Sequence, residues 1–184
     1  MGELVPGREC GPCDLCCAVP VIPELGKPPG VVCGHSRGGC DIYESRPDVC
    51  RRFFCAWRRT KLIPDDWRPD RCGVFATLDT DNVPPQFGGK AGISLMLTDN
   101  PLKTVRQPWF QDFVAGAVRD RVPLFLGLPG PKGMQAAMML MNTAEMQAAA
   151  ARSRAAVKDV LEHMLKRLSA HDFVPYEMTQ GGRM

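Results

Sequence analysis

Residues 10–17 read CGPCDLCC, which places four cysteines in a C-x2-C-x2-C-C pattern. Thiols at this spacing can converge on one metal ion or iron–sulfur cluster, because a short loop returns each side chain to the same centre. The adjacent Cys16 and Cys17 side chains are expected to point in different directions. They therefore serve two centres, or one of them lies outside the ligand shell of a single centre. In either case the stretch predicts a metal site wrapped in loops.

Further cysteines follow at short intervals. All nine cysteines of the chain lie in the first 72 of its 184 residues. Eight of them form two sets and are the candidate metal ligands: Cys10, Cys13, Cys16 and Cys17, then Cys33, Cys40, Cys50 and Cys55. Such clustering is not typical of cysteines that serve only as small buried apolar residues. Cys72 could be a ninth ligand, and His35, two residues after Cys33, could bind zinc. We prefer to interpret Cys72 as an apolar residue at the start of a strand, and His35 as a loop residue.

Charge and hydropathy argue against a nucleic-acid-binding, secreted or membrane-spanning protein. A formal net charge of +3 is too small to indicate a nucleic-acid partner. No stretch resembles a signal peptide or a transmembrane span of about 20 apolar residues, so we expect a cytoplasmic protein without a membrane partner. In a reducing compartment, clustered thiols are ligands or redox groups rather than a disulfide framework. A protein partner stays open.

The pattern of the chain changes after Cys72. Residues 1–72 lack sustained apolar periodicity, so we expect an irregular, metal-bound module that the metal stabilises. Residues 73–184 are expected to form an α+β domain. Its elements are predicted in the order strand, strand, helix, twice: strands 74–78 and 93–97, helix 108–121, strands 123–126 and 134–141, and helix 142–170. This order predicts an antiparallel sheet with two helices on one face.

Apolar spacing supports the last helix. Its buried face is predicted at helical intervals: Val157, Val160, Leu161, Met164, Leu165 and Leu168. Asn142 and Glu145 are expected to form a capping pair at its start. In the first region, residues 42–47 and 49–57 are predicted as short helical turns, the second of which would place Cys50 and Trp57 near one face.

The two cysteine blocks together resemble a known family. CGPCDLCC at 10–17, followed by GCDIYESRPDVCR at 39–51, is similar to the YkgJ-type cysteine-cluster family over about residues 8–55. That family is described as a zinc- or iron-chelating domain, and it includes a branch related to flagellin lysine N-methylases. The resemblance implies seven ligands: Cys10, Cys13, Cys16, Cys17, Cys33, Cys40 and Cys50. Cys55 falls where many members have no cysteine.

Basic residues surround the second block. Residues 46–61 contain six basic residues and one acid, Asp48. A basic patch with aromatic neighbours can bind nucleic acid. We prefer charge compensation, because a centre held by four thiolates carries net negative charge that nearby guanidinium groups stabilise. Arg46 and Arg51 lie within the family-like block and are therefore predicted to lie beside the ligands without binding the metal.

Two kinds of centre fit these cysteines. The C-x2-C-x2-C spacing and the arginines favour a [4Fe–4S] cluster, although thiolate zinc sites use similar residues. The CGPC tetrapeptide also matches a thioredoxin dithiol, which needs a preceding strand that residues 1–9 cannot form. We expect a metal-binding protein with a role in metal handling or assembly. The alternative is an iron–sulfur enzyme for electron transfer, methyl transfer or protein modification, although no catalytic residue can be identified.

Overall fold

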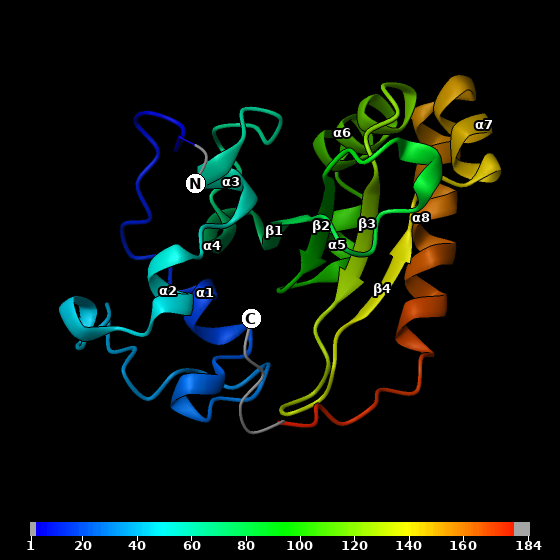
Figure 1. The fold of residues 1–184 in the computed structure, drawn as a ribbon. Helices are drawn as coiled ribbons and strands as arrows, with labels where there is room; N and C mark the ends of the chain where they lie inside the picture. The colour runs from blue at the N-terminus through cyan, green and yellow to red at the C-terminus, as the bar shows by residue number, and fades with distance from the viewer. Residues whose placement is uncertain (1–2, 179–184) are drawn as a thin grey trace. The chain divides into compact units, whose positions relative to one another are not determined.

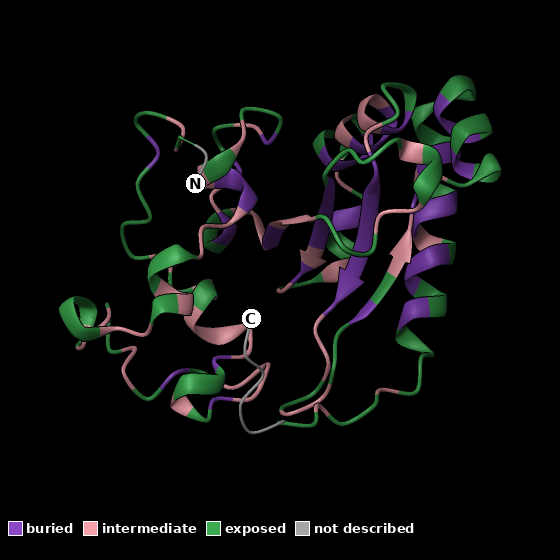
Figure 2. Cartoon of the chain, viewed as in Figure 1, coloured by how far each residue is buried: buried purple, intermediate pink, exposed green. Residues whose placement is uncertain are grey.

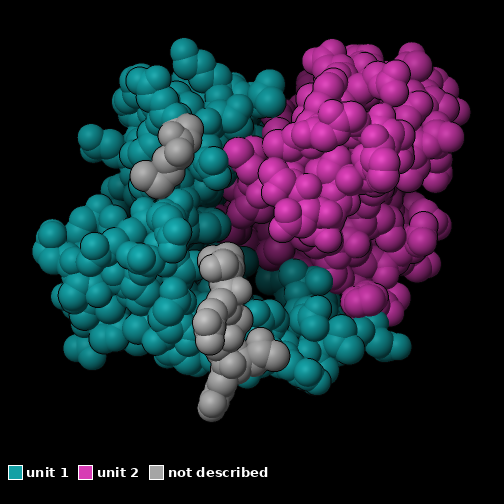
Figure 3. Space-filling model, viewed as in Figure 1, with its two compact units in different colours: residues 1–72, 129–136, 172–184 teal, residues 73–128, 137–171 magenta. Residues whose placement is uncertain are grey.

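Residues 73–128 and 137–171 fold around a four-stranded sheet with helices packed against it (Figure 1). The computed structural model describes residues 3–178. These residues separate into two compact units (Figure 3). Unit 1 consists of residues 3–72, 129–136 and 172–178, and unit 2 contains the sheet. Two segments of the predicted second region thus belong to unit 1.

The sheet of unit 2 contains the four predicted strands in the order β1-β2-β3-β4. Their bounds are β1 Val74–Asp79, β2 Gly92–Leu97, β3 Leu124–Leu128 and β4 Ala137–Leu140. The pairs β1–β2 and β3–β4 are antiparallel, whereas β2 and β3 are parallel, with Ile93 opposite Leu124. The α+β class is confirmed, and the prediction of a purely antiparallel sheet is wrong.

The parallel pair follows from the connection between β2 and β3. Two helices lie in it, α5 (Pro101–Val105) and α6 (Pro108–Arg119). A helical crossover returns the chain to the edge at which the previous strand began, and the next strand then runs parallel to it. The sequence predicted one helix here but did not predict α5. Apolar runs alone do not distinguish a hairpin from a crossover.

The core of unit 2 lies between the sheet and its helices. Helices α6 and α8 (Arg154–Ser169) contact each other, and both contact β3, so they cover the same face of the sheet. The six predicted apolar positions of the last helix are all buried, as is Phe110 of α6. Figure 2 shows the buried strands and the buried inner faces of these helices. Apolar periodicity therefore located the core correctly.

The single helix predicted over 142–170 is two helices, α7 (Ala144–Arg152) and α8. Ser153 separates them, because its backbone is extended, with φ −172° and ψ 159°. Its hydroxyl accepts a hydrogen bond from the amide of Ala156 at 3.2 Å and so caps α8. A serine side chain that bonds the backbone in this way competes with helix continuation.

The predicted capping pair at Asn142 and Glu145 is also wrong. The cap of α7 is Thr143, whose hydroxyl accepts from the amide of Met146 at 3.1 Å. The Asn142 side chain accepts from the amide of Leu124 at 2.7 Å and donates to the carbonyl of Val122 at 2.8 Å. Asn142 therefore fixes the start of β3 instead of a helix end.

Unit 1 is built from short helices joined by loops. Its helices and 3-10 turns are α1 Leu15–Ala18, η1 Pro23–Leu25, η2 Tyr43–Ser45, α2 Asp48–Arg52, α3 Ala56–Arg59 and α4 Pro69–Cys72. The turn predicted over 42–47 corresponds to η2. The one predicted over 49–57 is broken into α2 and α3, because Phe53 adopts an extended backbone. Cys50 and Trp57 consequently do not share one helical face.

A buried arginine organises part of unit 1. The Arg8 side chain is only 6% exposed. Its guanidinium donates to the carbonyls of Trp57, Thr60 (2.9 Å) and Ile63 (2.7 Å), and to the carboxylate of Asp65. The Trp57 ring lies 5.5 Å from the guanidinium carbon. One cation thus satisfies carbonyls that the short helices leave unpaired.

Two later segments complete unit 1. The connection between β3 and β4 is much longer than a tight hairpin turn, and its Gly133 amide donates to the carbonyl of Pro29 at 2.9 Å. The amide of Tyr176 donates to Gly133 at 2.8 Å, and that of Gln135 donates to Val174 at 2.8 Å. The predicted second hairpin is therefore confirmed, but its second strand begins at Ala137 instead of 134.

Candidate functional site

All nine cysteines lie in unit 1 and carry free thiols. The CGPC segment forms a tight turn, in which the amide of Cys13 donates to the carbonyl of Cys10 at 3.1 Å. Gly11 has a φ of 54°, a left-handed conformation that glycine adopts without steric cost. Helix α1 follows at once and carries the adjacent cysteine pair. The turn and the short helix thus position the first cysteine set.

Four thiols interact electrostatically and are here called group A: Cys10, Cys13, Cys16 and Cys55. Burial is the largest cause of the raised pKa of Cys55, and the charges of Cys10 and Cys13 raise it further. Burial likewise raises the pKa of Cys13, with a smaller contribution from Cys10. Cys55 therefore joins the CGPC segment although 38 residues separate it from Cys17 in the chain.

Backbone amides point at the sulfurs of group A. The amides of Leu15 and Asp70 hydrogen-bond Cys13 and oppose the rise in its pKa. The amides of Arg58 and Trp57 do the same for Cys55. Hydrogen bonds of this kind favour the thiolate over the thiol and are one means by which proteins tune sulfur ligands.

Arg68 lies next to the CGPC turn. A side chain at Gly11 would place its Cβ 3.2 Å from a terminal nitrogen of Arg68, so this guanidinium lies directly over the turn. The charges of Cys13 and Cys10 contribute to the raised pKa of Arg68, after its hydrogen bond to Asp70. That pair is bidentate, at 2.7 and 2.9 Å, which holds the guanidinium in place.

A second set of four thiols is here called group B: Cys17, Cys33, Cys40 and Cys50. Burial raises the pKa of Cys50, and the charges of Cys17, Cys33 and Cys40 raise it further. The amide of Cys33 donates to the carbonyl of Cys17 at 2.9 Å, which joins two segments 16 residues apart. A β-bridge between Ser36 and Cys40 closes the loop after Cys33.

Lys27 places a buried positive charge next to group B. Its side chain is 5% exposed, and its ammonium donates to the carbonyls of Ala18 (3.1 Å), Pro20 and Pro28 (3.3 Å). Burial lowers the pKa of Lys27, while the charges of Cys33, Cys17 and Cys50 act against this shift. The carbonyls hold the ammonium in place, and the thiols lie close enough to interact electrostatically with it.

The two groups meet at the adjacent pair in α1. A hydrogen bond between the two thiols lowers the pKa of Cys17 to about 6 and raises that of Cys16. The two side chains thus diverge less than expected. Their other neighbours differ, however: Cys16 interacts with Cys10 and Cys13, whereas Cys17 interacts with Ser36 and Lys27.

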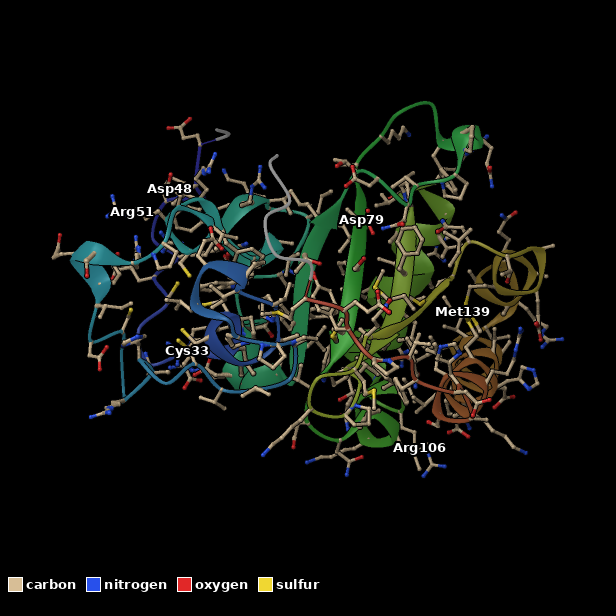
Figure 4. All side chains as sticks on the ribbon, turned by 60° about the horizontal axis from the view of Figure 1, so that its bottom comes forward. Cys33, Asp48, Arg51, Asp79, Arg106 and Met139 are labelled. Carbon is tan, nitrogen blue, oxygen red and sulfur yellow. The ribbon has the colours of Figure 1, made fainter. Side chains whose placement is uncertain are left out.

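The two predicted arginines brace the loop that precedes α2. Arg51 donates to the carbonyls of Arg46 at 2.9 Å and Glu44 at 2.8 Å. The Arg46 guanidinium lies 3.7 Å from the centre of the Tyr43 ring. Asp48 and Arg51 both belong to α2, and Figure 4 labels them together with Cys33. Their predicted role beside a metal ligand stays a prediction.

The two further candidates lie outside both groups as defined. His35 is in the loop between Cys33 and Cys40, and its Nδ1 lies 2.8 Å from a carboxylate oxygen of Asp41. Cys72 is the last residue of α4. Neither placement tests whether these residues bind metal.

The thiols do not form a preassembled coordination site. Within residues 3–178, no three or more side chains of histidine, cysteine, aspartate or glutamate are arranged to hold a metal ion. The chemistry of the donor set nevertheless fits a thiolate-bound metal, since soft sulfur ligands come with amide donors and nearby cations. Binding would require the thiols to turn toward a common centre. Among the described residues, no helix combines the length and apolar character that crossing a bilayer requires.

Unit 2 has a separate cavity of about 410 Å³. Its lining includes Arg119, Arg121 and Asn142, and the lining residues carry no acidic side chain. The amide of Asn142 is occupied by backbone partners of β3. This lining lacks a nucleophile paired with a base, so the cysteine groups remain the candidate site.

Comparison with known proteins adds no assignment. No protein-family model, no curated protein and no solved structure matches this chain. The resemblance to the YkgJ-type cysteine-cluster family therefore rests on the quoted residues alone.

Sequence reasoning missed two cations that interact with the thiols, Lys27 and Arg68. Lys27 carried a usable signal, because it is the single lysine or arginine between Arg8 and Arg37 and lies between the cysteine blocks. Arg68 carried none, because its place over Gly11 depends on a contact across 57 residues of chain.

Proposed function

We propose that unit 1 binds metal through cysteine thiolates and that the protein acts in metal handling or assembly. The observation that carries the proposal is that eight of the nine cysteines fall into two groups whose members interact electrostatically. The proposal places the protein in a reducing compartment such as the cytoplasm, where thiols remain available as ligands.

The electrostatics of the free thiols explain why a cation would be bound. Burial and neighbouring sulfur charges raise the pKa values of Cys13, Cys50 and Cys55 and so disfavour their thiolates, whereas the hydrogen bond from Cys16 lowers the pKa of Cys17. A metal cation replaces this repulsion by bonds to each sulfur. Binding must release protons, so metal affinity should rise with pH up to the range in which the thiols ionise.

The ligands would be the eight cysteines of groups A and B. A [4Fe–4S] cluster is the preferred cargo, because C-x2-C-x2-C segments with a remote fourth cysteine occur in cluster-binding proteins. Zinc would use the same thiolates. A zinc ion or an iron–sulfur cluster, when bound, would cross-link the loops that carry the cysteines. A cluster would also supply a one-electron redox centre. Arg68 and Lys27 would balance the negative charge of the bound thiolates.

Anaerobic purification followed by iron, zinc and acid-labile sulfide analysis tests the proposal. We expect stoichiometric metal that is lost when the cysteines of both groups are replaced by alanine. A protein that remains metal-free after reconstitution with Fe²⁺ and sulfide, and after addition of Zn²⁺, would contradict it. A colourless protein with stoichiometric zinc and no sulfide would keep the metal proposal and overturn the choice of cluster.

A further inference from the structure

The cavity of unit 2 is lined by two arginines and no acidic side chain. We propose that it binds a small phosphorylated compound, a phosphomonoester, through the guanidinium groups of Arg119 and Arg121. All of its lining residues belong to unit 2, and none is a cysteine. The inference therefore does not depend on whether unit 1 binds metal.

Two helices of unit 2 form one wall of the cavity. Helix α6 supplies Val118 and Arg119 near its C-terminus, and α7, which packs against α6 (Figure 1), supplies Gln147. Nη1 of Arg119 donates to the carbonyl of Ala150 on α7 at 3.4 Å. Within the part of the chain that the structure describes, this guanidinium has no other hydrogen-bond or ion-pair partner. Most of its five N–H donors are therefore available to a ligand.

The connection between β1 and β2 forms another wall. A 3-10 turn in it, η3 (Pro85–Phe87), supplies Gln86 and Phe87. Val83 packs directly on Gly92 at the start of β2, where a Cβ would lie 2.9 Å from the valine side chain. This contact holds the connection against the sheet. The Gln86 carboxamide can donate to an anionic oxygen, and the Phe87 ring offers an apolar surface to an organic group.

Arg121 has a backbone conformation that usually requires glycine. Its φ is 55°, and it is the only non-glycine residue with a positive φ among those that the structure describes. It follows the end of α6, where the amide of Arg121 donates to the carbonyl of Val118 at 3.1 Å and the amide of Val122 donates to that of Ala117 at 2.9 Å. At this type of helix end the left-handed residue is commonly glycine, because a side chain there costs free energy.

The side chain of Arg121 therefore has no evident role in ending the helix. Its guanidinium lines the cavity and has no hydrogen-bond or ion-pair partner within residues 3–178. Unfavourable backbone conformations of this kind are often found where a side chain is held for binding. The unfavourable backbone and the unpaired charge of Arg121 are both accounted for if the guanidinium binds an anionic ligand.

The charge and size of the cavity indicate the class of ligand. Two guanidinium groups match the charge of a phosphomonoester dianion, whose oxygens accept parallel hydrogen bonds from arginine. The volume of about 410 Å³ is that of a site for a small organic molecule and exceeds the needs of a bare phosphate ion. Phe87 and Val118 supply apolar surface for the organic part. A phosphomonoester of a small organic alcohol therefore fits better than inorganic phosphate.

Titration of the full chain with phenyl phosphate tests the proposal, with inorganic phosphate and benzoate as comparison ligands. Phenyl phosphate should bind more tightly than either, and the amide NMR signals that shift should include those of residues 86–87, 118–121 and 147. Absence of binding, or shifts confined to residues outside the cavity, would overturn the proposal. Tighter binding of benzoate would overturn the choice of a phosphorylated ligand.

The substitution Arg121→Gly separates binding from folding. Glycine adopts the left-handed conformation without steric cost, so the thermal stability of R121G should stay at the wild-type value or rise. Its affinity for phenyl phosphate should fall about tenfold or more, because a charged hydrogen-bond donor is lost.

Two further arginine variants complete the test. Arg119→Gln should weaken binding to a similar extent. Arg167→Gln removes an exposed arginine of α8 that does not line the cavity, and it should bind phenyl phosphate as the wild type does. Wild-type affinity in R121G, or equal losses of affinity in all three variants, would overturn the proposal.

Discussion

Unit 2 buries many apolar side chains between a sheet and helices, whereas unit 1 buries fewer apolar side chains and encloses two charged ones. Leu95 and Leu126 are fully buried in the centre of the sheet of unit 2. In unit 1, an arginine and a lysine are buried among backbone carbonyls. Apolar burial contributes stability in proportion to area, so unit 2 gains more stability from apolar burial than unit 1 does. Under the proposed function, bound metal would add to the stability of unit 1.

Removal of metal should produce the largest difference in stability between the two units. Chelation of the reconstituted protein should abolish hydrogen-exchange protection in residues 3–72, because metal binding supplies the folding free energy of a loop-rich module. Protection in β2, β3 and α8 should change little. Equal loss of protection in both units would show that they share one folding unit.

Truncation of a buried side chain in the sheet should destabilise unit 2 and leave unit 1 unchanged. Leu126→Ala removes a fully buried side chain of β3 and should lower the free energy of unfolding of unit 2 by about 2–5 kcal/mol. Metal content should stay at the wild-type value. Met138→Ala, at a position 39% exposed on β4, serves as the control in thermal denaturation. A parallel loss of metal in L126A would contradict separate stabilisation.

The two units also differ in how much of their structure the sequence could predict. The apolar stripe of α8 and the four strands were predictable, because periodicity depends on local spacing. The parallel pairing of β2 and β3 was not, because a strand's direction depends on its connection. The break at Ser153 was missed because apolar spacing continues across it, while a single hydroxyl changes the backbone.

For the candidate site too, some features were predictable from the sequence and others were not. The eight cysteines are evident from spacing, but their assignment to two groups requires contacts such as Cys33 with Cys17. The same holds for Arg68, which reaches Gly11 only in the folded chain. The sequence indicated which residue types are present, and the three-dimensional contacts indicated which of them lie together.

Loss of the buried arginine should have an intermediate effect confined to unit 1. Arg8→Ala leaves the carbonyls of Trp57 and Ile63 without their charged donor. Hydrogen bonds to charged groups contribute about 1.5–3 kcal/mol, so we expect a destabilisation of unit 1 of that order. It can be measured by hydrogen exchange, or as the chelator concentration at which half of the protein has lost its metal. Arg37→Ala removes a side chain that is 78% exposed and is the control. Equal effects of both substitutions would argue against Arg8 as an anchor.

The smallest expected effect lies at the break between α7 and α8. Ser153→Ala removes the hydroxyl that accepts from the amide of Ala156 and should lower the stability of unit 2 by about 1 kcal/mol. Ser169→Ala, at the other end of α8, should be close to neutral in the same denaturant titration. A more stable S153A protein would indicate that the helix prefers to continue through this position.

The arm formed by residues 129–136 also has a consequence for biosynthesis. Unit 1 is completed by Gly133, whose amide bonds Pro29 and whose carbonyl accepts from Tyr176. All eight clustered cysteines leave the ribosome before this arm is made. At bacterial or eukaryotic elongation rates the interval is on the order of ten seconds. During that time the cysteines are on a nascent chain that still lacks the segments closing around Pro29. Under the proposed function, this interval would let metal reach the thiols before the unit is complete.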